Sequence, residues 1–298
     1  MTELTIFTAP KPFTHPHINV IQRNAIRSWL ALGDAVNVLL LGDEPGIEDV
    51  AKELGATHIP TITRNEQGTP LLSDIFAQAY NHSTTPLLAY ANADIILMPD
   101  FVEAAHTLAA QSNEFLAVGR RWNLDITELL ALKPGWDAAL RDRTKREGEL
   151  YTPNGIDYFL YPRHLFHTIP AFAVGRPGWD NWMIYTAHTQ DYHLVDLTET
   201  ITIVHQNHDY HHLGGQKTHH NTEEGQTNIA LAGGSRHMYN ILDAKHKLSS
   251  DGRIRPIPLN RIRAVRALER RIRTNSDTGL RWYLASRLRR LQKRWKFQ

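Results

Sequence analysis

Short apolar runs along the chain alternate with stretches in which apolar residues recur every three or four positions. The runs predict strands at 4–9, 36–41, 58–62, 87–91 and 115–119. The stretches predict helices at 18–29, 48–54, 71–81 and 100–111. The run VNVLLL at 36–41 is nearly continuously apolar, which is typical of a strand covered on both faces. Strands alternating with helices predict an α/β fold with a mostly parallel central sheet and flanking helices.

The second part of the chain follows this alternation less closely. Its pattern predicts a helix near 126–132, a polar stretch through 141–149, and strands at 158–161 and 194–204. Pro256 and Pro258 mark a boundary before the last segment. We therefore expect one domain over 1–252, with halves of about 1–125 and 126–252, and a separate helical tail over 253–298.

Composition places the chain among globular proteins. Of its 298 residues, 42% are hydrophobic and 21% are charged, so it can bury a core and is not a disordered chain. The absence of cysteine excludes disulfide scaffolds, thiolate metal sites, iron–sulfur clusters and thiol nucleophiles. The N-terminal segment has no signal-peptide pattern, and no window approaches the roughly 18 apolar residues of a membrane span. We therefore expect a cytoplasmic protein.

The first candidate site follows the strand at 87–91, where Asn92, Ala93 and Asp94 precede another apolar run. Ligands bind at the carboxyl ends of strands in open α/β sheets, so an acid at this place is expected to face a crevice. One carboxylate together with a substrate diphosphate is enough to hold Mg²⁺ or Mn²⁺. The alternative is that Asn92 and Asp94 only cap the turn after the strand.

The second candidate is a cluster of histidines that fall within sixteen residues: His205, His208, His211, His212, His219 and His220. His205 directly follows a strand-like run and therefore also lies at a strand end. An imidazole there can ligate a metal ion, and Mn²⁺ tolerates one. The other histidines fall in a polar segment, and for at least four of the six a solvated loop is the simpler interpretation.

The third candidate is the run GRPGWDNW, in which Asp180 lies between two indoles, Trp179 and Trp182. Indole faces stack on sugar rings, and an acid between them could accept a proton from a bound hydroxyl. The alternative is a helix opened by Asp180 or Asn181, with both tryptophans in the core. Both interpretations can hold together.

Weaker signals also suggest a polar pocket. They comprise the turn after the first strand (Thr8, Ala9, Pro10), a helix start (Ser73, Asp74), the pair Arg120 and Arg121 after a strand, and the segment from Asn154 to Asp157 before one. An arginine at 120 or 121 could neutralise a diphosphate, although a structural pair of arginines is an equally simple interpretation.

Taken in order along the chain, these residues resemble the GT-A class of nucleotide-sugar glycosyltransferases, in a bacterial branch with an NxD variant of the DxD motif. The resemblance covers about residues 4–212. It implies a GT-A, Rossmann-like sheet. It also implies transfer of a sugar from a nucleoside diphosphate, with UDP as the expected nucleotide, to an acceptor hydroxyl. Asn92 in place of the first DxD acid leaves metal binding to Asp94, His205 and the diphosphate.

The resemblance also implies a role for each candidate residue. Asp180 is the expected base, or a residue that positions a hydroxyl if the reaction retains configuration. Mn²⁺ or Mg²⁺ is expected on Asp94 and His205. The nucleotide sugar is expected on Thr8, Ala9, Pro10, Ser73, Asp74, Asn92, Ala93, Asp94, Arg120 and Asp157. The acceptor, a glycan or a lipid-linked sugar, is expected on Trp179, Asn181 and Trp182, and the expected setting is cell-envelope polysaccharide or glycolipid synthesis.

The tail differs from the body in charge. Residues 253–298 contain fifteen basic and two acidic residues, a net charge of +13, whereas residues 1–252 carry −11. In a helix over 279–297, one apolar stripe is formed by Leu280, Leu284, Leu288, Leu291 and Trp295. This pattern is typical of a helix lying on an anionic membrane surface, here the inner face of the cell membrane. Alternatively, the stripe docks onto the acidic body or onto a second copy of the chain, and nucleic acid is the least favoured partner.

Two other functions stay open from the sequence. Nucleotidyl transfer uses a similar sheet and metal, and a non-catalytic carbohydrate-binding or scaffold protein could be recruited by the same tail.

Overall fold

The structure is a computed structural model, and it describes residues 3–208, 222–276 and 278–295. A nine-stranded sheet runs through the molecule in the order β13-β12-β10-β6-β9-β4-β1-β2-β3. Its strands are β1 (Leu4–Thr8), β2 (Val36–Leu41), β3 (Thr57–Ile59), β4 (Leu87–Ala91), β6 (Phe115–Val118), β9 (Tyr158–Pro162), β10 (His193–Asp196), β12 (His246–Leu248) and β13 (Ile254–Pro256). Five of the eight strand pairings are parallel, which confirms the predicted mixed α/β fold.

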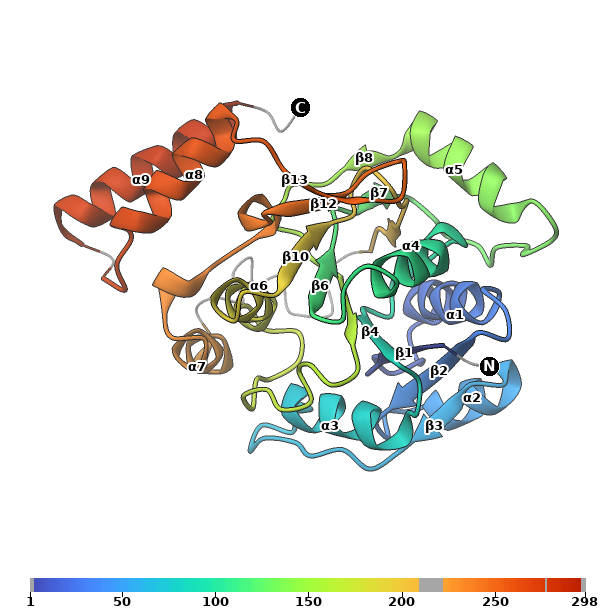
Figure 1. Ribbon diagram of the computed structural model, residues 1–298. Helices are drawn as coiled ribbons and strands as arrows, with labels where there is room; N and C mark the ends of the chain where they lie inside the picture. The colour runs from blue at the N-terminus through green and yellow to red at the C-terminus, as the bar shows by residue number, and fades with distance from the viewer. Residues whose placement is uncertain (1–2, 209–221, 277, 296–298) are drawn as a thin grey trace.

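The helices flank this sheet (Figure 1). They are α1 (Pro16–Leu30), α2 (Ile47–Leu54), α3 (Leu72–His82), α4 (Asp100–Ala109), α5 (Trp136–Glu147), α6 (Trp179–Thr189), α7 (Glu223–Leu231), α8 (Arg261–Ile272) and α9 (Gly279–Arg294). Two short 3-10 turns, η3 (Ser235–His237) and η4 (Ile241–Asp243), follow α7.

The central strands are apolar on both sides because each side packs against helices. In β1, Leu4 and Ile6 join the apolar cluster that contains α1, α2 and α4 residues, whereas Phe7 joins the cluster on the other side with α3 and α6. All five residues of β1 are buried. This two-sided burial is the reason that the strands read as continuous apolar runs in the sequence.

A second, four-stranded sheet lies beside the first, in the order β5-β11-β7-β8. It contains β5 (Ile95–Ile96), β7 (Trp122–Leu124), β8 (Glu149–Leu150) and β11 (Val204–Gln206). β11 pairs antiparallel with β5 and parallel with β7. Because β5 follows β4 after a three-residue turn, this small sheet brings segments near residues 94 and 205 together.

Predictions for the second part of the chain were less accurate. The expected helix at 126–132 is absent, and α5 forms instead, largely in the stretch that reads as polar. Within α5 only Leu140 and Thr144 are buried, so little apolar periodicity marks it. The expected strand at 194–204 is two strands, β10 and β11, which belong to different sheets.

The sheet also extends across the expected domain boundaries. β13 pairs with β12 beyond residue 252, where the body was expected to end. β9 from the second half pairs with β4 and β6 of the first, so the two expected halves share one sheet. Beyond β13, α8 and α9 lie side by side at the edge of the molecule (Figure 1).

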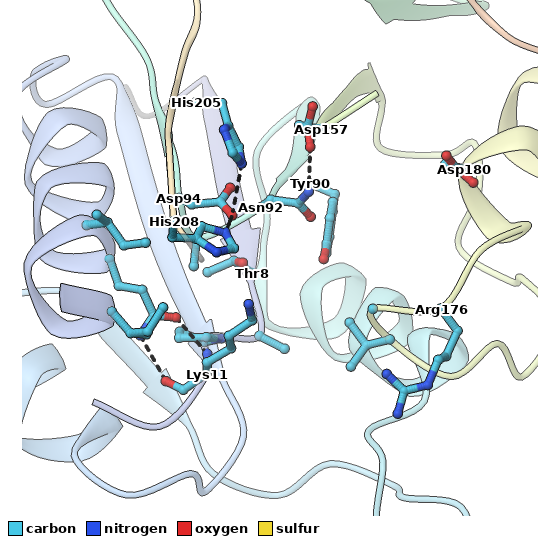
Figure 2. A pocket seen from close by; sticks show the side chains of 18 of the residues that line it. Thr8, Lys11, Tyr90, Asn92, Asp94, Asp157, Arg176, Asp180, His205 and His208 are labelled. Carbon is cyan, nitrogen blue, oxygen red and sulfur yellow. Dashed lines mark hydrogen bonds and ion pairs between the residues drawn. The ribbon is translucent and has the colours of Figure 1, made fainter. Parts of the chain in front are cut away.

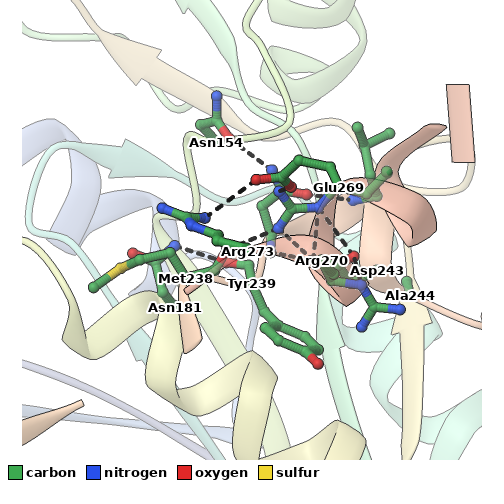
Figure 3. A network of polar contacts seen from close by, with 12 residues as sticks. Asn154, Asn181, Met238, Tyr239, Asp243, Ala244, Glu269, Arg270 and Arg273 are labelled. Atoms are coloured by element: carbon green, nitrogen blue, oxygen red, sulfur yellow. Dashed lines mark hydrogen bonds and ion pairs between the residues drawn. The ribbon is translucent and has the colours of Figure 1, made fainter. Parts of the chain in front are cut away.

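Buried charges attach α8 to the body (Figure 3). Arg266 donates to Asp243 at 2.7 Å and to Glu269 at 2.7 Å, and the side chains of all three are at most 5% exposed. Arg266 also donates to the Met238 carbonyl at 2.7 Å. A buried charge without its partner is costly, so this network fixes where α8 sits.

We expect Asp243→Ala to lower the free energy of unfolding by about 3–5 kcal/mol, because the buried Arg266 would lose one of its two acidic partners. The measurement is urea unfolding followed by circular dichroism. The matched control is Glu199→Ala, which breaks a surface pair with Lys247 and should cost less than about 1 kcal/mol. Equal small losses in the two variants would show that the buried network does not anchor α8.

Candidate active site

A pocket with a volume of about 840 Å³ opens at the carboxyl ends of β1 and β4. The turn after β1 (residues 8–12) and the turn after β4 (residues 92–94) form one wall. Residues 154–157 before β9, the segment 174–180, and the histidines at 205 and 208 complete the lining. Parallel strands present their carboxyl ends on one side, which is where open α/β sheets bind ligands.

Three potential metal ligands meet on one wall of this pocket (Figure 2). His208 Nε2 lies 3.2 Å and His205 Nε2 lies 3.6 Å from Asp94 Oδ2. One ligand atom from each of these residues lies within 4.8 Å of the others. A carboxylate and two imidazoles at this spacing can bind a single divalent cation.

Strand pairing holds His205 beside Asp94. His205 pairs with Ile95 across β11 and β5, and the Gln206 backbone N–H donates to the Asp94 carbonyl at 3.1 Å. The buried Gln206 side chain also donates to the Ile21 carbonyl at 2.7 Å and accepts from Asn24 at 2.9 Å. These bonds tie β11 to α1 and so fix the imidazole that follows Val204.

The next turn of chain positions His208. Asn207 donates its side-chain amide to Asp125 Oδ1 at 2.8 Å, and the ring of His17 donates to the Asn207 carbonyl at 3.0 Å. Both bonds come from segments distant in sequence. His208 therefore faces the same carboxylate as His205 although the two lie three residues apart.

The electrostatics of the cluster favour an ionised Asp94. Burial by itself raises the pKa of Asp94, but His205, His208 and Lys11 outweigh it and bring the pKa well below its usual range. Burial lowers the pKa of His205, although Asp94 acts in the opposite direction. A carboxyl group binds a metal ion in its deprotonated form, so Asp94 is in the state that a cation requires.

Two buried polar atoms of this cluster are available to a ligand. Within the part of the chain that the structure describes, Asp94 Oδ1 and His205 Nδ1 are buried and have no hydrogen-bond partner. A buried polar atom without a partner is costly in a folded protein unless a bound group satisfies it. The orphaned Asp94 oxygen therefore fits a cation.

A second carboxylate, Asp157, is bonded to the turn after β4. It accepts from Asn92 at 2.9 Å and from Arg121 at 2.6 Å, both at Oδ1. The Asn92 backbone N–H also donates to the Asp157 carbonyl at 2.9 Å. Among the described residues Asp157 Oδ2 has no partner, so one oxygen remains available to a ligand.

The opposite wall carries Asp180 and Arg176 (Figure 2). Gly178, at φ 109°, precedes α6 and lets the chain turn into the helix, so Asp180 lies in its first turn. Burial raises the pKa of Asp180 to about 6, while backbone N–H groups of Asn181 and Gly178 act against the increase. Arg176 is paired with Glu224 at 2.6 Å.

Lys11 lies on the turn after β1, on the same side as Asp94 (Figure 2). Burial lowers its pKa, and the nearby Asp94 raises it again. The backbone of Lys11 is fixed by two bonds to the Gln22 side chain, at 2.7 and 2.9 Å. The turn is therefore held in place, and it brings the ammonium group of Lys11 toward the pocket.

The structure gathers ten of the predicted residues around one pocket: Thr8, Ala9, Pro10, Asn92, Ala93, Asp94, Asp157, Trp179, Asp180 and His205. Trp179 contributes mainly to the core, because its indole packs at 5.0 Å between the rings of Tyr90 and Phe159. An open stacking platform of two indoles is therefore not formed.

Five of the predicted residues lie outside the pocket lining. Asp74 accepts from the Thr63 backbone, and Ser73 lies beside it at the start of α3. Arg120 points away and donates to the Tyr151 carbonyl at 2.6 Å. Asn181 donates to the Tyr239 carbonyl, and Trp182 packs on Phe172, because α6 turns these side chains away from Asp180. The helix of the alternative interpretation is thus present, but its N-cap is Gly178 and not Asp180 or Asn181, and Trp182 is only partly buried.

Lys11, Arg176 and His208 line the pocket but were not among the predicted site residues, and Arg121 was considered only as the alternative to Arg120. Arg121 instead of Arg120 meets the pocket because neighbouring residues of an extended chain point to opposite sides. The sequence pattern grouped His208 with the histidines of a polar loop, because His208 does not directly follow a strand. The remaining histidines of that cluster, at 211, 212, 219 and 220, lie outside the described residues.

No family model and no curated protein matches this chain. It is similar to the solved structure of glucosyl-3-phosphoglycerate synthase from Mycobacterium tuberculosis in complex with Mn²⁺, UDP-glucose and phosphoglyceric acid. The identity is 18%, the match covers 87% of this chain and 88% of that one, and the TM-score is 0.49. The same synthase with Mg²⁺ and UDP matches with 17% identity, coverage of 77% and 78%, and a TM-score of 0.48.

A mannosyltransferase from Pyrobaculum calidifontis, in complex with GDP-mannose and Mn²⁺, is also similar. Its identity is 10%, with 70% of this chain and 57% of that one covered, at a TM-score of 0.45. At such identities and TM-scores, the residues of the pocket and not these matches are the basis for inferring an activity.

The raised pKa of Asp180 makes stability depend on pH in a defined direction. The folded chain keeps this proton up to about pH 6, whereas the unfolded chain releases it near the ordinary pKa of 3.8. Between these values the unfolded state binds fewer protons, so the free energy of unfolding falls as the pH rises. We expect Asp180→Asn to be more stable than the unmodified chain by about 1–3 kcal/mol near neutral pH, and by nothing below about pH 4.

The measurement is urea unfolding of both chains across that pH range. Asp251→Asn is the matched control, since Asp251 is an exposed acid whose pKa is lowered by Arg255. A stability difference for Asp180→Asn that stays constant with pH would contradict the assignment.

Proposed function

We propose that this protein is a metal-dependent glycosyltransferase that moves a sugar from a nucleoside diphosphate sugar, with UDP as the nucleotide, to an acceptor hydroxyl. One observation carries the proposal. Asp94, His205 and His208 converge on one wall of a pocket of about 840 Å³, and the acid Asp180 lies on the opposite wall. A charged donor and a hydroxyl-bearing acceptor can thus be held between a cation site and a base.

The donor set suits Mn²⁺ better than Mg²⁺. Mg²⁺ prefers oxygen ligands and keeps several waters, whereas imidazole suits transition metals. Asp94 would supply a negative charge, and His205 and His208 would supply ring nitrogens. The amide at 92 adds no charge, and it is already bonded to Asp157. A cation held there would neutralise charge that develops on the leaving diphosphate.

The nucleotide belongs on the same wall. The turn Thr8, Ala9, Pro10 lies at the end of β1, and Thr8 Oγ1 is buried with no hydrogen-bond partner among the described residues. Asp157 Oδ2 is likewise available to a ribose hydroxyl. Lys11 adds a positive charge on the side where the diphosphate would lie.

Asp180 is the proposed base for an inverting transfer. Its pKa of about 6 leaves it ionised at neutral pH yet basic enough to accept a proton. The acceptor oxygen attacks the anomeric carbon, its proton passes to an Asp180 carboxylate oxygen, and the bond between that carbon and the diphosphate oxygen breaks. If the transfer retains configuration, Asp180 instead orients a hydroxyl.

We also propose that the acceptor is a glycan or a lipid-linked sugar, in cell-envelope polysaccharide or glycolipid synthesis at the inner face of the membrane. The basic tail and its net charge of +13 support this placement. No helix among the described residues is long and apolar enough to cross a bilayer. A homo-oligomer stays compatible with this proposal.

Metal and nucleotide binding test the cation site. We expect Mn²⁺ with UDP to raise the melting temperature, and Asp94→Ala to remove that increase because the anionic ligand is lost. His205→Ala and His208→Ala should each weaken binding of Mn²⁺ alone at least roughly tenfold in calorimetry. His106→Ala, at a surface histidine outside the pocket, is the control and should behave as the unmodified chain. Unchanged Mn²⁺ affinity in all three site variants would exclude this cation site.

Product analysis tests the reaction. With a panel of UDP-sugars and glycan acceptors, we expect glycosylated product and UDP, and Asp180→Asn should lower kcat by roughly 10²–10⁴-fold while UDP and Mn²⁺ still bind. Release of pyrophosphate would instead identify nucleotidyl transfer. Donor binding without any turnover, in the presence or absence of acceptor, would identify a non-catalytic binding protein.

A further inference from the structure

The hairpin of α8 and α9 buries charged side chains and exposes apolar ones, which is the reverse of a usual surface element. Arg266 and Glu269 of α8 are buried, whereas Leu268 is 51% exposed. Among the described residues, six of the nine exposed large apolar side chains lie between Leu259 and Leu284. Apolar side chains that gather in one region of a surface mark an interaction site.

The two sides of α9 differ in their partners. Ala285 and Gln292 are buried, and Arg289 reaches Glu269 of α8 at 3.7 Å, so this side faces the rest of the protein. Leu280, 73% exposed, and Leu284, 44% exposed, lie on the other side at helical spacing. The first two leucines of the predicted stripe are therefore not docked onto the acidic body.

Arginines border the exposed stripe. Arg287, Arg290 and Arg294 follow one another at three- and four-residue steps, and together with Leu288 and Leu291 they line a groove of about 280 Å³. Other basic side chains of the hairpin, by contrast, are engaged with the two buried acids Asp243 and Glu269. The positive charge available to a partner thus lies along the same side of α9 as the leucines.

The geometry points to the surface of an anionic lipid bilayer as the partner of this side of α9. Leucines can enter the acyl boundary while the arginines beside them extend to lipid phosphates. A symmetric contact with a second copy would place two arginine-rich surfaces against each other, which like charges oppose. Figure 1 shows the hairpin at the edge of the molecule, beside the body that carries the pocket.

This inference extends the proposed action on membrane-associated acceptors, and it names the surface involved. Its test requires no sugar transfer, so the two proposals can fail separately. The probe is a set of sedimenting vesicles, made either of phosphatidylcholine alone or of phosphatidylcholine mixed with phosphatidylglycerol. The full chain is expected to bind the mixed vesicles and to be released by high salt.

Two variants separate charge from apolar contact. The triple substitution Arg287→Gln, Arg290→Gln and Arg294→Gln should lower partitioning roughly 10- to 100-fold. Leu280→Asp with Leu284→Asp should lower it at least roughly tenfold. Matched controls on the body are Lys133→Gln, Lys145→Gln and Arg146→Gln for charge, and Leu129→Asp with Leu231→Asp for apolar surface. These controls should bind as the unmodified chain does.

Sedimentation velocity of the same proteins measures self-association, and so tests a second copy of the chain as the competing partner. Equal binding to both kinds of vesicle, or equal loss in hairpin variants and controls, would overturn the proposal. Self-association that the leucine variants abolish, without vesicle binding, would also overturn it and identify a second copy as the partner. Near-equal melting temperatures of all variants would show that the substitutions leave the fold intact.

Discussion

The candidate site depends on the pairing of one three-residue strand. β11 lies between β5 and β7, and this pairing places His205 against the turn that carries Asp94. So short a strand has few ladder bonds of its own. The buried amide of Gln206 supplies the rest, because it is bonded to α1 and to the backbone of Asp94. Loss of this anchor would leave the imidazole on an unfixed segment.

The surroundings of Asp94 and Asp180 shift the pKa values of these two carboxyl groups in opposite directions. Both Asp94 and Asp180 are buried, and burial favours the neutral form of each. Two imidazoles and a lysine outweigh that effect at Asp94, whereas at Asp180 backbone N–H groups offset it only in part. Asp94 is thereby ionised, whereas Asp180 exchanges a proton near pH 6. Separation of pKa values across one pocket is a frequent basis of acid–base catalysis.

Charge also organises the C-terminal hairpin. Asp243 and Glu269 engage the arginines that point inward, and this fixes α8 against the segment that contacts Asn154 of the pocket. The outward side of α9 is then left with leucines and arginines. Some arginines of the basic hairpin thus pair with buried acids and attach the hairpin to the acidic body. The arginines on the outward side of α9 are available to a partner.

The sequence by itself determined the strands and helices of the first half, the mostly parallel sheet, and the positions of Asp94 and Asp180 near the ends of elements. These follow from local periodicity and from Gly-rich turns, which act over a few residues. Only the tertiary structure decided that His208 joins His205, that Arg121 faces the pocket while Arg120 does not, and that Trp182 turns away from it. Such choices between neighbours depend on the direction of a side chain. For Arg121 and Trp182 that direction follows from where an extended segment or α6 begins. For the histidines it depends on hydrogen bonds to segments a hundred or more residues away in the chain, such as those that Gln206 makes to Asp94 and α1.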